Sequence, residues 1–137
     1  DLTVTGVQTC ALPIYSFNES SVISAHHCHC KDCQKSTGSG KATIIMIPEN
    51  ALKMNGEIKI YTVTGTDGSH VSRGFCESCG SPLISYIEEM EGIRLIKAGS
   101  LDDSSWLKID SNFWSSTARV WSPVDETLHS FNKNPQT

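Results

Sequence analysis

Cys28-His29-Cys30-Lys31-Asp32-Cys33 places three cysteines so close together that ordinary globular packing does not explain them. In an extended backbone Cys28 and Cys30 project to the same face, and the two residues before Cys33 allow a turn that brings its sulfur back. Three thiolates can therefore converge on one ion, and Zn²⁺ is the usual ion for such ligands. Three ligands are one short of a closed structural tetrahedron, so the motif predicts a catalytic-type zinc site with an open position.

The fourth position of this site has three candidates nearby in the sequence, His26, His27 and His29. Water or a substrate thiol could occupy it instead. We expect the histidines to lie at the surface or to support the ligands from outside, because His29 points away from its flanking cysteines if the segment is extended.

A second cluster, Cys76-Glu77-Ser78-Cys79-Gly80, has the form of a zinc knuckle. Gly80 can relieve the backbone after the second sulfur. Cys76 and Cys79 would supply half of a structural zinc site. A redox dithiol and two merely buried thiols are the alternatives. The remaining cysteine of the chain is Cys10.

Length and charge favour one small domain that does not bind nucleic acid. The chain has 137 residues, and its 11 basic and 15 acidic residues give a net charge of −4. No run of Lys or Arg suggests a phosphate-backbone track, and no apolar stretch approaches the roughly 20 residues of a membrane-spanning helix. CxC and CxxC spacings without a signal peptide favour metal over disulfides, so we expect a cytoplasmic protein. Nothing in the sequence bears on the oligomeric state.

The chain beyond Tyr15 consists of short β-rich runs separated by Gly, Pro, Asn and Asp, which predicts a mainly β fold of small antiparallel sheets. Helix is expected only at 31–36 and at 101–105, where Asp102 and Asp103 suit a first turn. The predicted strands are 41–47, 57–63, 70–75, 82–86, 93–98 and 107–113.

The first residues call for separate treatment, because Val4 to Ile14 resembles the translation of a sequencing-library adapter. We therefore predict that residues 1–14 are non-native and that the natural protein begins near Tyr15. The predicted domain covers residues 15–131, and residues 132–137 form a polar, flexible tail.

Several segments together resemble one known family. They are His27 to Ser39, Gly74 to Leu83, Ala98 to Asp103, and Phe113-Trp114 to Trp121. In combination they are similar to the glutathione-dependent formaldehyde-activating enzymes, whose domain also occurs in a vertebrate centromere protein. The similarity extends from about Tyr15 to Phe131.

The resemblance implies a β-tent fold gathered around zinc. It assigns Cys28, Cys30 and Cys33 as catalytic zinc ligands, and Cys76 and Cys79 as half of a structural site. The other half would be a CxC in an N-terminal strand. Here Gln8 stands where its first cysteine belongs and Cys10 about where its second belongs. Cys10 could supply a third sulfur, but a four-cysteine site cannot form.

The resemblance also implies an activity, the joining of formaldehyde to the thiol of glutathione to give S-hydroxymethylglutathione, a carbon-sulfur lyase reaction in reverse. A non-catalytic zinc module with an interaction surface and a redox protein using the CxxC are the alternatives. The two carboxylates of glutathione favour cationic side chains near the metal. The sequence offers five candidates and does not distinguish among them: Lys31, Lys35, Lys41, Arg73 and Arg119. The three tryptophans could line a pocket, although core positions are expected.

Overall fold

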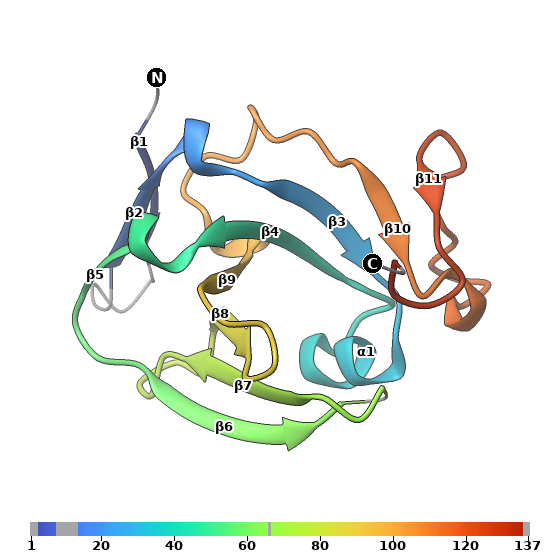
Figure 1. The fold of residues 1–137 in the computed structure, drawn as a ribbon, viewed down its shortest axis with the longest axis horizontal. Coiled ribbons are helices and arrows are strands. Elements are labelled where there is room, and N and C mark those ends of the chain that lie inside the picture. The colour runs from blue at the N-terminus through green and yellow to red at the C-terminus, as the bar shows by residue number, and fades with distance from the viewer. Residues whose placement is uncertain (1–2, 8–13, 66, 136–137) are drawn as a thin grey trace.

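The computed structural model describes residues 3–7, 14–65 and 67–135, which form two β-sheets (Figure 1). The smaller sheet has the order β1 (Thr3–Val7), β2 (Ile14–Asn18), β5 (Lys53–Asn55). The larger sheet has the order β11 (His129–Ser130), β10 (Ser111–Phe113), β3 (Ser24–Cys28), β4 (Ala42–Pro48), β9 (Ile93–Lys97), β8 (Pro82–Ile87), β7 (His70–Phe75), β6 (Lys59–Thr64). The predicted mainly β fold is confirmed.

The strand pairings are antiparallel except at β10, which runs parallel to both β3 and β11. Strands β6 to β9 form a meander in sequence order, and β4 pairs with β9 on one side and β3 on the other. The six predicted strands correspond to β4 and β6 to β10, the last being shorter than expected. Strand β3 was not predicted, because its sequence SAHHC lacks the apolar alternation that marks a strand.

One α-helix, α1 (Lys31–Thr37), follows the first cysteines as predicted. Four short 3-10 turns complete the described helical structure: η1 (Glu19–Ser21), η2 (Glu49–Ala51), η3 (Ala98–Ser100) and η4 (Ser115–Thr117).

The predicted helix at 101–105 is wrong. The acidic side chains there serve other contacts, since Asp102 accepts a hydrogen bond from Thr5 Oγ1 at 2.8 Å and Asp103 accepts one from the amide of Ser105 at 2.9 Å. The Asp102 amide also donates to the Thr5 carbonyl, which ties this segment to β1. The Asp103–Ser105 hydrogen bond is a local side-chain contact of the kind that competes with helix formation.

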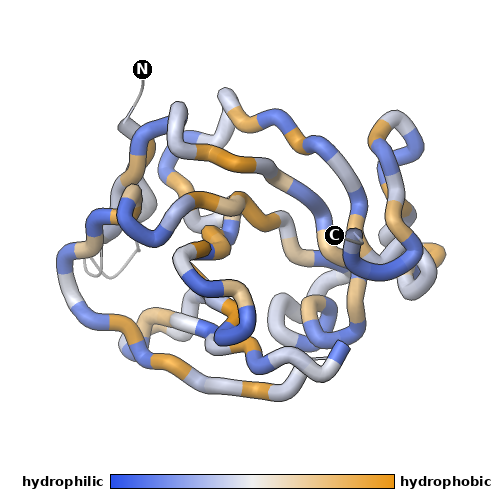
Figure 2. Tube along the Cα trace, in the orientation of Figure 1, coloured by the Kyte–Doolittle hydropathy of each residue, from blue (hydrophilic) through white to orange (hydrophobic). Residues whose placement is uncertain are grey.

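The larger sheet has an apolar layer on each face. Along β4, Ile45 and Ile47 join one core cluster with Tyr15 and Phe17 of the smaller sheet, whereas Ile44 joins a second cluster with the cysteines of the first motif. Successive side chains of a strand point to opposite faces, which explains this division. Figure 2 shows the hydrophobic residues of β4 in the middle of the molecule.

The predicted N-terminal boundary, between residues 14 and 15, falls inside β2 after its first residue. Strands β1 and β2 pair antiparallel from Thr3↔Asn18 to Val7↔Ile14. Gly6 also bridges to Leu101. The origin of residues 1–14 stays a prediction. Among the described residues, no helix has both the length and the apolar character needed to cross a membrane.

Candidate metal centre

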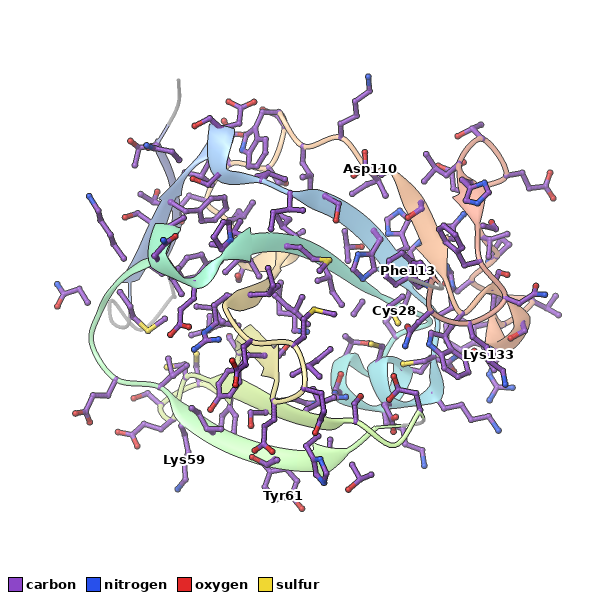
Figure 3. The ribbon with its side chains drawn as sticks, in the orientation of Figure 1. Cys28, Lys59, Tyr61, Asp110, Phe113 and Lys133 are labelled. Atoms are coloured by element: carbon purple, nitrogen blue, oxygen red, sulfur yellow. The ribbon has the colours of Figure 1, made fainter. Side chains whose placement is uncertain are left out.

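Three cysteine sulfurs meet where β3 ends and α1 begins. Cys28 is the last residue of β3, Cys30 is the N-cap of α1, and Cys33 lies in its first turn. Their Sγ atoms all lie within 4.8 Å of one another, and all three residues are buried. Figure 3 shows Cys28 beside Phe113, its partner in the β3–β10 ladder. The predicted convergence of the three sulfurs is present in the structure.

Local backbone geometry explains how the motif closes. Cys30 is extended, with φ −65° and ψ 157°, and its Sγ accepts a hydrogen bond from the Cys33 amide at 3.3 Å. The sulfur therefore acts as the helix cap, a position that favours a negatively charged thiolate. Gly38 ends the helix with φ 70°, a conformation that costs glycine little.

The three thiols influence one another strongly. Hydrogen bonds from Cys28 and Cys33 lower the pKa of Cys30 to about 2. Hydrogen bonds to Cys30 and Cys33, together with burial, raise the pKa of Cys28. The cluster thus readily holds one negative charge, and binding of a cation would displace the remaining thiol protons.

The cluster could hold a metal ion, and its donors suit a soft one. Zinc–thiolate bonds of about 2.3 Å in a tetrahedron put the sulfurs roughly 3.8 Å apart. This separation agrees with the three Sγ atoms, which lie within 4.8 Å of one another. Among the described residues, no histidine nitrogen joins the group of ligand atoms within 4.8 Å of one another. The three sulfurs therefore fit a metal with a further coordination position open.

The three candidate histidines have other surroundings. His26 is buried and stacks on Phe113 at a centroid distance of 3.6 Å, and burial lowers its pKa to about 3, so the ring is neutral at pH 7. His27 pairs through Nδ1 with Thr43 Oγ1 at 2.8 Å. His29 is fully buried, and burial likewise lowers its pKa. Because His26 and His29 are buried, the surface alternative is wrong for these two, and the alternative that they support the ligands from outside stays a prediction.

A cavity of about 610 Å³ adjoins the cluster, and we call it the cysteine cavity. Cys28, Cys30 and Cys33 all contribute to its wall. The larger sheet contributes alternate residues of its strands, so that Leu95 and Lys97 of β9 line the cavity whereas Ile96 between them joins the opposite core. The open side of the cysteine cluster can therefore receive a small molecule.

The structure separates the candidate cations. Of the five from the sequence only Arg73 lines the cysteine cavity, and Lys97, which sequence reasoning missed, lines it as well. Arg119 instead donates to Gln34 Oε1 at 3.1 Å. The alternation in Ile93–Lys97 puts Leu95 and Lys97 on one face, but the sequence does not tell which face meets the cysteines.

The tryptophans also differ in position. Trp114 is buried and lines the cysteine cavity, and its indole nitrogen donates to Asn134 Oδ1 at 2.9 Å. Trp106 packs against the first core cluster, whereas Trp121 is exposed. Trp106 therefore packs against the core, as expected, whereas Trp114 forms part of the wall of the cysteine cavity.

The second cysteine pair lies in a turn between β7 and β8. Cys76 is buried and Cys79 exposed, and the Gly80 amide donates to the Cys76 carbonyl at 2.7 Å. Gly80 has φ 75°, as the knuckle form requires. The predicted third sulfur, Cys10, lies outside the described residues. The metal roles of Cys76 and Cys79 stay predictions.

Comparison with known proteins places the chain in a family. Its fold is similar to the crystal structure of a Rhodobacter sphaeroides protein, a structural-genomics target, with a TM-score of 0.57, 15% sequence identity, and coverage of 77% of this chain and 96% of that chain. At that identity the likeness concerns the fold alone. A search of curated proteins gave no significant match. A family model matches residues 3–117, so the chain belongs to the glutathione-dependent formaldehyde-activating enzyme family.

Proposed function

We propose that this protein is a zinc-dependent enzyme of the carbon-sulfur lyase type, which joins a thiol of the glutathione kind to formaldehyde or a similar small electrophile. The product is an S-hydroxymethyl adduct. The observation that carries the proposal is the buried group of three cysteine sulfurs in the wall of a cavity of about 610 Å³. The family match supports the choice of substrates.

The roles of the residues follow from their positions. Cys28, Cys30 and Cys33 would hold the zinc ion. Bound zinc would supply Lewis acidity and stabilise a substrate thiolate near neutral pH. The cavity would orient the thiol and the aldehyde, and its apolar residues Leu95 and Trp114 would exclude water.

The reaction balances without any further co-reactant. The thiol sulfur forms a bond to the aldehyde carbon, the carbon–oxygen double bond becomes single, and the thiol proton ends on the oxygen. Formaldehyde offers few groups to recognise, so specificity would reside in the contacts with the thiol carrier.

Two accompanying assignments belong to the same proposal. Cys76 and Cys79 would be half of a structural zinc site, with Cys10 as a third sulfur at most. A cytoplasmic location would keep these thiols reduced and supply the thiol substrate.

A paired mutation experiment tests the proposed chemistry. Zinc content and the rate of adduct formation from glutathione and formaldehyde are measured for the wild type, for Cys30→Ser and for the control Lys35→Ala. We expect Cys30→Ser to lose most zinc from the cavity site and essentially all turnover above the uncatalysed rate, with its far-ultraviolet circular dichroism largely retained. Lys35 is exposed on the same helix and does not line the cavity, so its variant should behave as the wild type.

A zinc-loaded, folded wild type without turnover of any thiol would contradict the proposal. A module in which zinc only holds the fold would then be favoured, and in that case Cys30→Ser should mainly lower the thermal midpoint.

A further inference from the structure

Two cationic side chains, one from β7 and one from β9 of the larger sheet, reach the cysteine cavity. Arg73 of β7 is the register partner of Ser85 of β8, and Ser85 is the register partner of Leu95 of β9. Lys97 follows two residues later on the same face of β9 and donates from Nζ to Ser85 Oγ at 3.0 Å. Arg73, Ser85 and Lys97 therefore form a diagonal row across three strands, and all three line the cavity.

This row retains unused hydrogen-bonding capacity. Arg73 Nε is buried and has no hydrogen-bond partner among the described residues, and its Nη1 makes only a long contact of 3.4 Å with the Asp32 carbonyl. The ion pairs of the described residues join His70 to Glu89 and Arg94 to Glu49, so they include neither Arg73 nor Lys97. A buried guanidinium donor without an acceptor is costly and calls for an explanation.

The acidic residues of the cavity wall are Asp32, Asp67 and Glu89. Asp67 accepts hydrogen bonds from Ser69 and Asn134, and Glu89 pairs with His70. Burial lowers the pKa of Lys97 below its ordinary value, as does Arg73, and the cysteines of the cluster oppose this shift. Two basic side chains thus share the cavity wall next to the sulfurs, and an added anion would stabilise the charged form of Lys97.

We propose that Arg73 and Lys97 form a carboxylate-binding site for the thiol substrate, with Ser85 positioning the Lys97 ammonium. This inference rests on the proposed function and adds to it the residues that determine specificity: Arg73 and Lys97 would make the site bind a thiol that carries a carboxylate in preference to a neutral thiol of the same size. A guanidinium donates to a carboxylate in the plane of its fork, and an ammonium adds a second charge from the side.

A competing role for Lys97 is to balance the charge of the cysteine thiolates. The two roles differ in what they predict. If Lys97 only balances the thiolate charge, its replacement should change the affinity for zinc and leave the preference for an acid over its ester unchanged. Carboxylate binding makes the preference for an acid over its ester depend on both Arg73 and Lys97.

The test measures binding separately from chemistry. The zinc-loaded full chain is titrated calorimetrically with S-methylglutathione, which has no free thiol, and with its dimethyl ester, which has no free carboxylate. We expect the wild type to bind the free acid at least about tenfold more tightly than the ester, as charge-assisted hydrogen bonds predict. Lys97→Gln and Arg73→Gln should each reduce that ratio to about threefold or less.

Two further variants make the comparison specific. Lys97→Arg keeps the positive charge and should keep most of the preference, and the exposed control Lys35→Gln should keep all of it. Zinc content and circular dichroism identify any variant that fails to fold. If Lys97→Gln fails to fold, the acid-to-ester affinity ratio of Lys97→Arg decides the outcome, since a lost preference in that variant would contradict the inference.

The inference is overturned if the wild type binds acid and ester equally, if it binds neither, or if folded Lys97→Gln and Arg73→Gln keep the wild-type ratio. The reduced ratio in these variants supports it even if no thiol is turned over. Failure of the inference and failure of the proposed reaction are therefore separate results.

Discussion

Trp114 shows how one residue shapes the cavity wall. Among the described residues it is the one non-glycine residue with positive φ, at 59°. Its amide donates to the Lys133 carbonyl, and its indole nitrogen donates to Asn134 Oδ1. These contacts stabilise a backbone conformation that a bulky residue rarely adopts. The chain thereby turns after β10 with the indole against the cavity.

Gly38 offers a test of a local backbone requirement. Its φ is 70° and a Cβ there would meet nothing within 4 Å, so Gly38→Ala changes the backbone energy without a clash. We expect a loss of about 1 kcal/mol in the free energy of unfolding, measured by urea denaturation of the zinc-loaded protein.

Gly99→Ala is the matched control, because its Cβ also meets nothing within 4 Å and its φ lies outside the left-handed region. A similar loss in both variants would show that the conformation at Gly38 is not the cause.

At the scale of elements, the candidate metal centre lies at the junction of β3 and α1. The ladder with β4 and β10 fixes Cys28, and the start of α1 fixes Cys30 and Cys33. Gln34 of the same helix donates to the carbonyls of His29 and Thr117, at 2.8 and 3.0 Å. The helix is therefore held to both the strand end and η4, which limits relative movement of the three sulfurs.

Strand β2 is linked to η3 through Tyr15. Its hydroxyl is hydrogen-bonded to Ser100 Oγ, which donates to the Lys97 carbonyl at 2.7 Å, so the phenol acts as the donor in the first bond. Burial raises the pKa of Tyr15 from its ordinary value of 10.0 to about 12. The folded state therefore disfavours the phenolate.

The Tyr15 shift predicts alkaline destabilisation of the fold. Since the folded pKa lies above the unfolded one, the stability that this group contributes is complete below pH 10 and is lost as the pH rises toward 12, by about 2–3 kcal/mol. Urea denaturation at pH 8 and pH 11.5 measures it.

Tyr15→Phe is the comparison for that measurement. It should be about 1 kcal/mol less stable than the wild type at pH 8, because the hydrogen bond is lost. It should also lose less stability than the wild type between the two pH values. An identical alkaline loss in both proteins would contradict the assignment.

At the scale of the whole molecule, the curved sheet brings distant segments around one cavity. Figure 1 shows β3 and β4 on one side, β6 and β7 on the other, and α1 near one end between them. The cysteines come from the first side, Arg73 from the second, and Lys97 from β9 between them. A metal bound by the cysteines would therefore contribute to the stability of the folded state as a whole.

Removal of metal tests that contribution. With free zinc at 100 times its dissociation constant, the folded protein gains about 2.7 kcal/mol, so a strong chelator should lower the thermal midpoint measurably. Cys30→Ser should show a smaller chelator effect, confined to any zinc at Cys76 and Cys79. A wild-type midpoint unchanged by the chelator would contradict metal binding at the cysteine cluster.

Much of the fold was predictable because local patterns and structure agree. The strands β4 and β6 to β9 have β-rich sequences with turn residues between them, and α1 directly follows the CxC. Strand β3 was missed because its His26 and His27 are polar, and tertiary burial rather than hydropathy makes it a strand. The helix expected at 101–105 was wrong because its aspartates contact Thr5 and Ser105 instead.

The three-sulfur cluster follows from local sequence alone. Cys28, Cys30 and Cys33 are so close along the chain that a strand end followed by one helical turn suffices to join their sulfurs. The side chains that face these sulfurs depend instead on how the strands pair. Lys97, Arg73 and Trp114 reach the cavity because strand order, register and sheet curvature bring their strands there, and these depend on long-range pairing that no local pattern encodes.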